Sequence, residues 1–220
     1  MIAVLDYGIG NLRSAEKALR RVGGDARLVA EPAEAEGAAG VVLPGVGAFG
    51  ACARALRSSG LDAVALRAVR EGVPFLGICV GCQLLFEGSE EDPDEPGLGV
   101  LEGSVRRIPG EVKLPQMQWN RLELRPGARS VMLPPQEDGG WFYFVHSYAP
   151  VPEGGAADCV VATCDYGGPV VAALERASLW ATQFHPEKSG RSGLELLGRF
   201  VRGCSGVGAG AGRRPAGLPG

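Results

Sequence analysis

The chain has 220 residues, of which 45% are hydrophobic and 21% charged, and its formal net charge at pH 7 is −3. A chain of this length and apolar content can bury a sizeable core, which excludes disorder over its whole length. The 22 basic and 25 acidic residues nearly balance, so no broad basic surface for nucleic acid is expected.

No stretch approaches the roughly 18 consecutive apolar residues that a membrane span requires, and the first residues do not read as a signal peptide. The chain has six cysteines, which in a protein of this length without a secretion signal are expected to be reduced thiols. We therefore expect a cytoplasmic protein with no membrane partner.

Short apolar segments alternate with amphipathic ones over the first eighty or so residues. Strands are predicted at residues 1–6, 26–30, 41–43 and 75–79, and helices at 12–22 and 61–69. Wholly apolar strands that alternate with helices are typical of a parallel sheet covered on both faces. Ligands bind such sheets at the carboxyl ends of the strands, where this chain carries Asp6-Tyr7-Gly8, Pro44-Gly45-Val46-Gly47 and Cys79-Val80-Gly81.

The second half of the chain has a different pattern. Residues 87–95 are strongly acidic and are predicted to form a solvated loop. A final helix is predicted at 191–203, and short strands that extend the same sheet in a mixed or antiparallel way are predicted at 119–124, 141–148, 159–164, 170–174 and 179–184.

The expected fold class is therefore α/β, with a mostly parallel central sheet, helices on both faces and an antiparallel extension in the second half. We expect one domain over residues 1–203. The Gly-, Ala- and Pro-rich residues 204–220 are expected to form a disordered tail.

The segment Gly77-Ile78-Cys79-Val80-Gly81 ends a predicted strand and precedes a helical stretch. Gly-x-Cys-x-Gly at a strand-to-helix turn is the cysteine form of the nucleophile elbow, in which the glycines permit a tight turn. The helix N-terminus favours a thiolate there, and the N–H of Val80 can stabilise an oxyanion. A buried structural cysteine is the alternative. A redox or zinc role for Cys79-x-x-Cys82 lacks a suitable second motif.

The chain has only two histidines, His146 and His185. A thiol nucleophile needs a base, and the base needs a group that orients it. Because alternate residues of an extended segment point the same way, Glu187 can share a side with His185. Cys79, His185 and Glu187 are therefore a candidate triad, whereas His146 is expected to be structural.

Several motifs occur along the chain at 6–12 (DYGIGNL), 44–49 (PGVGAF), 77–86 (GICVGCQLLF), 115–120 (PQMQWN), 144–148 (FVHSY) and 183–189 (QFHPEKS). Together they resemble the class I, or triad, glutamine amidotransferases, and in particular the glutaminase subunits of imidazole glycerol phosphate synthase. The elbow and the His-Pro-Glu segment are shared by the class. The first two motifs are those that single out this subunit.

The resemblance implies the flavodoxin-like fold of the class and hydrolysis of glutamine to glutamate and ammonia, without a cofactor or a metal. Cys79 would form a γ-glutamyl thioester, and His185, held by Glu187, would act as acid and base. The oxyanion hole would be formed by Val46, Gly47 and Val80. Glutamine would be bound by residues on three segments, which are Gly45, Gln83, Ser147 and Tyr148.

In this family, the ammonia passes to a (β/α)8-barrel cyclase subunit, which makes imidazole glycerol phosphate and an aminoimidazole carboxamide ribotide in histidine biosynthesis. Asn11, Trp119 and Lys188 match positions on the side that faces this partner. Two positions depart from the family pattern, because Cys82 stands where Met is usual and Gln118 where Gly is usual. If the backbone at Gln118 has a positive φ, the segment must adjust locally.

Four alternatives stay open beside this interpretation. The chain could be another class I glutaminase, such as one that feeds pyridoxal phosphate synthesis, or a γ-glutamyl hydrolase, and the first two motifs argue against both. It could also be a catalytically silent regulatory subunit, against which the intact Cys79, His185 and Glu187 argue. An unrelated flavodoxin-like binder would show cofactor absorbance and no effect of Cys79→Ser.

Overall fold

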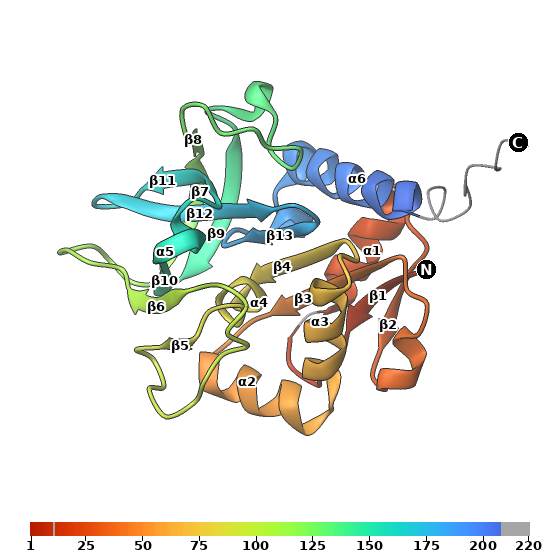
Figure 1. Ribbon diagram of the computed structural model, residues 1–220. Helices are drawn as coiled ribbons and strands as arrows, with labels where there is room; N and C mark the ends of the chain where they lie inside the picture. Colours follow the sequence, from red (N-terminus) through yellow and green to blue (C-terminus); the bar gives the residue numbers. More distant parts are fainter. Residues whose placement is uncertain (11, 208–220) are drawn as a thin grey trace, which may run out of the picture.

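The structure is a computed structural model, and it describes residues 1–10 and 12–207. Its centre is an eight-stranded sheet in the order β2-β1-β3-β4-β13-β12-β11-β8 (Figure 1). The strands of this sheet are β1 (Ile2–Leu5), β2 (Ala26–Val29), β3 (Gly40–Gly45), β4 (Phe75–Cys79), β8 (Glu123–Leu124), β11 (Val160–Asp165), β12 (Pro169–Arg176) and β13 (Leu179–Thr182).

The sheet has a parallel half and an antiparallel half. Strands β2, β1, β3, β4 and β13 run parallel to one another, whereas β12, β11 and β8 continue the sheet by antiparallel pairing. Every residue of β1, β3, β4 and β13 is buried, as expected for strands covered on both faces. The expected fold class is confirmed.

Helices cover both faces of this sheet. The helices are α1 (Leu12–Arg21), α2 (Phe49–Ser58), α3 (Leu61–Arg70), α4 (Val80–Gln83), α5 (Gly154–Ala157) and α6 (Gly190–Val207). Helices α1 and α6, from opposite ends of the chain, lie together on one side, and α2 and α3 lie on the other (Figure 1). Helix α6 runs beyond residue 203, and residues 208–220 of the expected tail lie outside the described residues.

Two small sheets stand apart from the central one, which corrects part of the expected extension. Strands β5 (Gly88–Ser89), β6 (Gly103–Arg107) and β10 (Tyr148–Pro152) form one, and β7 (Gln116–Arg121) and β9 (Trp141–His146) form the other. The segments 119–124 and 141–148, each expected as one strand, are therefore divided between sheets. The first divides at the buried Leu122 and the second at Ser147, whose carbonyl accepts the N–H of Ile108.

The acidic residues 87–95 are mostly loop and none of their six acids is buried, as expected for a solvated segment, but three of these acids also contact α2. Arg54 lies 3.1 Å from a carboxylate oxygen of each of Asp92 and Glu95, and Arg57 lies 3.1 Å from Glu95. Glu91 accepts the N–H of Phe49, the first residue of α2, at 2.8 Å. The acids are held because the arginines and the positive N-terminal end of α2 supply partners for them.

The strand register brings separate parts of the chain to one edge of the sheet. Gly45, at the end of β3, stands beside Cys79 at the end of β4, and Thr182 at the end of β13 stands beside Ile78. His185 follows β13 by three residues, so it emerges at the same edge. No helix in the described part of the chain is long and apolar enough to cross a membrane.

Candidate active site

Cys79 occupies a strained turn between β4 and α4. Its φ is 55° and its ψ −112°, and the only other described non-glycine residue with a positive φ is Ala177. A Cβ at Gly81 would lie 1.8 Å from the carbonyl oxygen of Leu43, and one at Gly77 would lie 2.9 Å from that of Gly81. Both glycines are therefore required by close backbone approach, and the turn is the one that the Gly-x-Cys-x-Gly motif predicts.

His185 and Glu187 form a buried pair beside this turn. The Nδ1 atom of His185 lies 2.8 Å from Oε1 of Glu187, and the two side chains are 2% and 7% exposed. Ser189 supports the segment from behind, because its hydroxyl donates to the carbonyl of His185 at 2.6 Å and accepts the N–H of Tyr143 at 3.0 Å. The Nε2 atom of His185 is buried and has no hydrogen bond of regular geometry to the described residues.

The surroundings of His185 favour its protonated form. Burial is the largest single influence and disfavours the charge, but the side chains of Cys79 and Glu187 together outweigh it. They raise the pKa of His185 from 6.5 to about 9. A protonated His185 beside the Cys79 sulfur is the arrangement that a thiolate nucleophile requires.

Cys79 and His185 open onto a cavity of about 400 Å³. Its lining residues are Val46, Gly47, Cys79, Val80, Gln83, Glu91, Pro115, Val145, His146, Ser147, Tyr148, His185 and Lys188. All the residues expected to bind glutamine or its oxyanion are in this set except Gly45. Gly45 packs beneath the turn, where a Cβ would lie 2.8 Å from the N atom of Gly81.

The segment expected to form part of the oxyanion hole is held by two side chains from behind. The hydroxyl of Tyr7 donates to the carbonyl of Pro44 at 2.7 Å, and the thiol of Cys52 donates to the carbonyl of Val46 at 3.3 Å. Gly47 has a φ of 91°, a conformation that L side chains rarely adopt. The N–H of Val80, the first residue of α4, has no acceptor within its own helix.

Two buried glutamines lie near Cys79, and the sequence motifs assigned a role to only one of them, Gln83. Gln83 donates from Nε2 to the carbonyl of Tyr148 at 2.9 Å and to Oε1 of Gln183 at 3.0 Å. Gln183 in turn places its Nε2 3.7 Å from the Sγ of Cys79. No local spacing indicates this contact, because Gln183 and Cys79 are 104 residues apart.

His146 also lines the cavity. Its Nδ1 lies 2.8 Å from the carbonyl of Tyr148, which can only accept, so the proton is on Nδ1. Burial is the main cause that lowers the pKa of His146 to about 4, and His185 contributes by repulsion. A neutral imidazole fixed in this way is consistent with the structural role expected for His146.

The residues expected at a partner interface are more scattered. Lys188 is exposed at the rim of the cavity, and Trp119 is 47% exposed on β7. The ring of Trp119 lies 3.8 Å from the Cβ position of Gly190, so the two are neighbours in space. Asn11 lies outside the described residues.

The two departures from the family pattern cause no visible strain. Gln118 lies inside β7 and is not among the described residues with positive φ, so no local adjustment is needed. Cys82 is fully buried in α4, where burial raises the pKa of its thiol. All six cysteines are free thiols, as expected. In the described ranges, no cluster of His, Cys, Asp or Glu is arranged to hold a metal ion.

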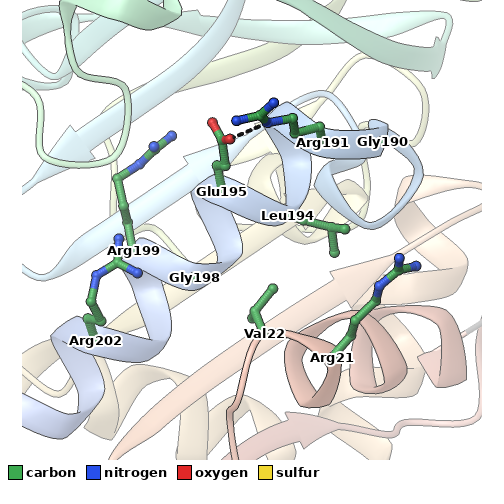
Figure 2. A pocket seen from close by; sticks show the side chains of 9 residues that line it. All are labelled: Arg21, Val22, Gly190, Arg191, Leu194, Glu195, Gly198, Arg199 and Arg202. Carbon is green, nitrogen blue, oxygen red and sulfur yellow. Dashed lines mark hydrogen bonds and ion pairs between the residues drawn. The ribbon is translucent and has the colours of Figure 1, made fainter.

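A larger groove, of about 690 Å³, lies between α6 and the end of α1 (Figure 2). Arg191 pairs there with Glu195 at 2.7 Å, and Arg199 pairs with Glu137 at 2.9 Å. The described lining residues of this groove include neither cysteine nor histidine. The smaller cavity at the strand ends, rather than the larger groove, therefore contains the reactive groups.

Comparisons with known proteins agree with this geometry. The family described as "Glutamine amidotransferase class-I" matches residues 3–204. The chain belongs to the class-I glutamine amidotransferase family.

Curated relatives of this amidotransferase match it over almost their whole length. It is 46% identical over 200 residues to the imidazole glycerol phosphate synthase subunit HisH of Moorella thermoacetica, which covers 90% of this chain and 93% of that protein. The subunit HisH of Thermosynechococcus vestitus is 48% identical over 205 residues, with 91% and 95% covered. The resemblance drawn from the motifs is confirmed.

A solved structure also shares the fold of this amidotransferase. It is described as "Crystal structure of glutamine amidotransferase" and has a TM-score of 0.69 and 25% sequence identity. The match covers 93% of this chain and 98% of that one.

Proposed function

We propose that this amidotransferase hydrolyses glutamine to glutamate and ammonia as the glutaminase subunit of an imidazole glycerol phosphate synthase, in histidine biosynthesis. The observation that carries the proposal is a cavity in which Cys79, in a positive-φ turn, meets a His185 that Glu187 holds at 2.8 Å. Relatives named as HisH subunits of that synthase support the substrate and the pathway.

In the first half of the reaction, the Cys79 thiolate attacks the carboxamide carbon of glutamine, and the carbonyl oxygen becomes an oxyanion. The N–H of Val80 and N–H groups of the Val46–Gly47 segment stabilise that charge. Protonated His185 gives its proton to the departing nitrogen, so ammonia leaves and a γ-glutamyl thioester remains.

In the second half, the neutral His185 takes a proton from water as the water attacks the thioester carbon. The carbon–sulfur bond breaks, glutamate leaves, and Cys79 returns as a thiolate beside a protonated His185. Glu187 accepts a hydrogen bond from Nδ1 throughout, so that Nε2 stays directed at the reacting atoms. Gln83 and the Ser147–Tyr148 segment hold the amino-acid end of glutamine.

The ammonia is delivered to a (β/α)8-barrel cyclase subunit. An exposed apolar face on the β7–β9 sheet supports docking of the cyclase there, because Met117 is 62%, Trp119 47% and Trp141 54% exposed. Directly paired residues of an antiparallel sheet share a face, so Trp119 and Tyr143 lie on this side together. Trp119, Lys188 and Asn11 are the proposed contacts, with no role for nucleic acid or a membrane.

The test separates glutamine chemistry from ammonia use. We expect Cys79→Ala to abolish synthesis of the ribotide product from glutamine, because the nucleophile is lost, while synthesis from added ammonium salts by the cyclase complex continues. Ammonia release and product formation would be measured on the purified complex. If Cys79→Ala removed both activities, the substitution would have disrupted folding or docking, and Cys79→Ser would then be compared.

The unmodified chain distinguishes the alternatives. Ammonia release that is low for the chain alone and rises with a ligand-loaded cyclase supports the synthase subunit. Ammonia release that is high for the chain alone and indifferent to the cyclase keeps the triad but indicates another glutaminase or a γ-glutamyl hydrolase.

A further inference from the structure

The Cys79 sulfur is reached by a buried side chain that the reaction described above does not use. Gln183 is fully buried, and its Nε2 lies 3.7 Å from the Sγ of Cys79. It is not among the residues that line the cavity, so it contacts the nucleophile from the protein side and not from the substrate side.

A chain of hydrogen bonds decides which end of the Gln183 amide faces the sulfur. The carbonyl of Tyr148 can only accept, so the side-chain atom of Gln83 that lies 2.9 Å from it must be the nitrogen. The same nitrogen lies 3.0 Å from Gln183, and the atom it meets there must be the oxygen. The nitrogen of Gln183 is therefore the end that faces Cys79, and it donates to the sulfur.

The carbonyl of Val145, another polar neighbour of the sulfur, favours the protonated thiol. The carbonyl oxygen of Val145 lies 3.9 Å from Sγ, where it accepts the S–H of a thiol but repels a thiolate. When the S–H bond breaks and the proton forms an N–H bond at Nε2 of His185, the sulfur has the amide of Gln183 as a fixed donor in addition to the protonated His185. Hydrogen bonds to a charged acceptor are stronger than those to a neutral one.

We infer that Gln183 is a thiolate-stabilising residue of this glutaminase, held in orientation by Gln83 and the carbonyl of Tyr148. The inference rests on the proposed function. It assigns to the pair Gln83–Gln183 the task of keeping an N–H donor aimed at Sγ in every stage at which the sulfur is charged.

The test compares Gln183→Met with a matched control, Gln116→Met. Gln116 is also fully buried and also places its Nε2 3.7 Å from a cysteine sulfur, that of Cys164, which has no part in the reaction. The readout is the pH profile of Cys79 alkylation by iodoacetamide, followed by peptide mass spectrometry, which needs no glutamine. Glutamine kinetics of the complex with the cyclase supply kcat and KM.

For Gln183→Met, we expect the midpoint of the alkylation profile to move up by about one pH unit, with kcat for glutamine about tenfold lower and KM nearly unchanged. For Gln116→Met, we expect the profile of the unmodified chain. A folded Gln183→Met protein with an unchanged profile and unchanged kcat overturns the inference.

A second variant covers a failure of Gln183→Met to fold. Gln183→Glu keeps the shape and the oxygen that accepts from Gln83, but places a carboxyl oxygen against the sulfur, so the midpoint should move up further. An unchanged midpoint in Gln183→Glu also overturns the inference. The proposed function fails differently, because the unmodified complex would then release no ammonia from glutamine whatever the alkylation profile shows.

Discussion

His146 is a buried base that the proposed reaction does not use, and its surroundings make it a source of acid sensitivity. Its pKa is about 4 in the folded chain and close to 6.5 when unfolded. A base whose pKa is lowered on folding contributes stability above its unfolded pKa, and this contribution is lost as the pH falls from 6.5 towards 4. Each pH unit in that window is worth about 1.4 kcal/mol.

We therefore expect the free energy of unfolding to fall by about 2 kcal/mol between pH 7 and pH 5 through this group alone. His146→Gln keeps an N–H donor for the carbonyl of Tyr148 but cannot titrate. Its free energy of unfolding should therefore fall by about 2 kcal/mol less than that of the unmodified chain between pH 7 and pH 5. Urea unfolding of both proteins at several pH values measures the difference. Parallel curves for the two proteins would contradict the assignment.

His185 acts in a separate window. The pKa of His185 rises on folding from 6.5 to about 9. Its contribution to the free energy of unfolding is therefore complete below pH 6.5 and is lost as the pH rises through about 9. His146 thus contributes to the acid limb of stability, and the pairing of His185 with Cys79 and Glu187 contributes to the alkaline limb.

The candidate triad could be assembled from the sequence because its signals are local. Cys79 stands between two glycines at the end of an apolar run, and Glu187 stands two residues from His185. Gln183 and Glu91 could not be anticipated in this way. Gln183 meets Cys79 across 104 residues, and Glu91 reaches the N–H of Phe49 across 42, so both contacts depend on how distant elements pack.

At the scale of elements, α6 supports the His-Pro-Glu segment through one glycine. A Cβ at Gly193 would lie 2.0 Å from the carbonyl oxygen of Pro186, which is backbone and cannot rotate away. Gly203, in the same helix, would meet nothing within 4 Å. The two glycines therefore offer a matched comparison inside a single helix.

We expect Gly193→Ala to lower the free energy of unfolding by about 1–3 kcal/mol and to reduce glutamine hydrolysis, because the helix must move from the segment that carries His185 and Glu187. Gly203→Ala should raise the free energy of unfolding by up to about 1 kcal/mol, since alanine has the higher helix propensity. Thermal unfolding and ammonia release would be measured for both. Equal effects on activity would contradict this account.

The elements that sequence patterns predicted well are those whose burial is uniform, such as β1, β3 and β4. Helix α2 was not predicted, although its buried residues Phe49, Cys52, Ala53 and Leu56 recur at helical spacing. The separation of β7 and β9 from the central sheet also had no signal in the pattern. Alternation along a strand indicates that one face is buried, but not which sheet the strand joins.

At the scale of the whole molecule, the exposed side of the β7–β9 sheet matters for assembly. Trp119 is 47% exposed there, and Val131, away from that sheet, is 67% exposed. We expect Trp119→Ala to weaken binding of the cyclase by tenfold or more, since a tryptophan at the centre of an interface contributes about 2 kcal/mol or more. Val131→Ala should bind as the unmodified chain does.

Titration calorimetry with the purified cyclase measures both affinities. Because Trp119 is exposed, Trp119→Ala should keep the unfolding temperature and the Cys79 alkylation profile of the unmodified chain. Unchanged affinity in Trp119→Ala would move the docking face elsewhere.

The adjacency of β4 and β13 has a consequence for synthesis of the protein on the ribosome. The Cys79 thiol is translated long before His185, its proposed base. Gln183, which begins the segment that carries His185, already follows Cys79 by 104 residues. Until β13 is added, β4 lacks one neighbour in the sheet and Cys79 lacks both its proposed base and its buried amide neighbour. Under the proposed mechanism, a chain that stops before β13 lacks the base for Cys79, and we expect such an incomplete copy to consume no glutamine.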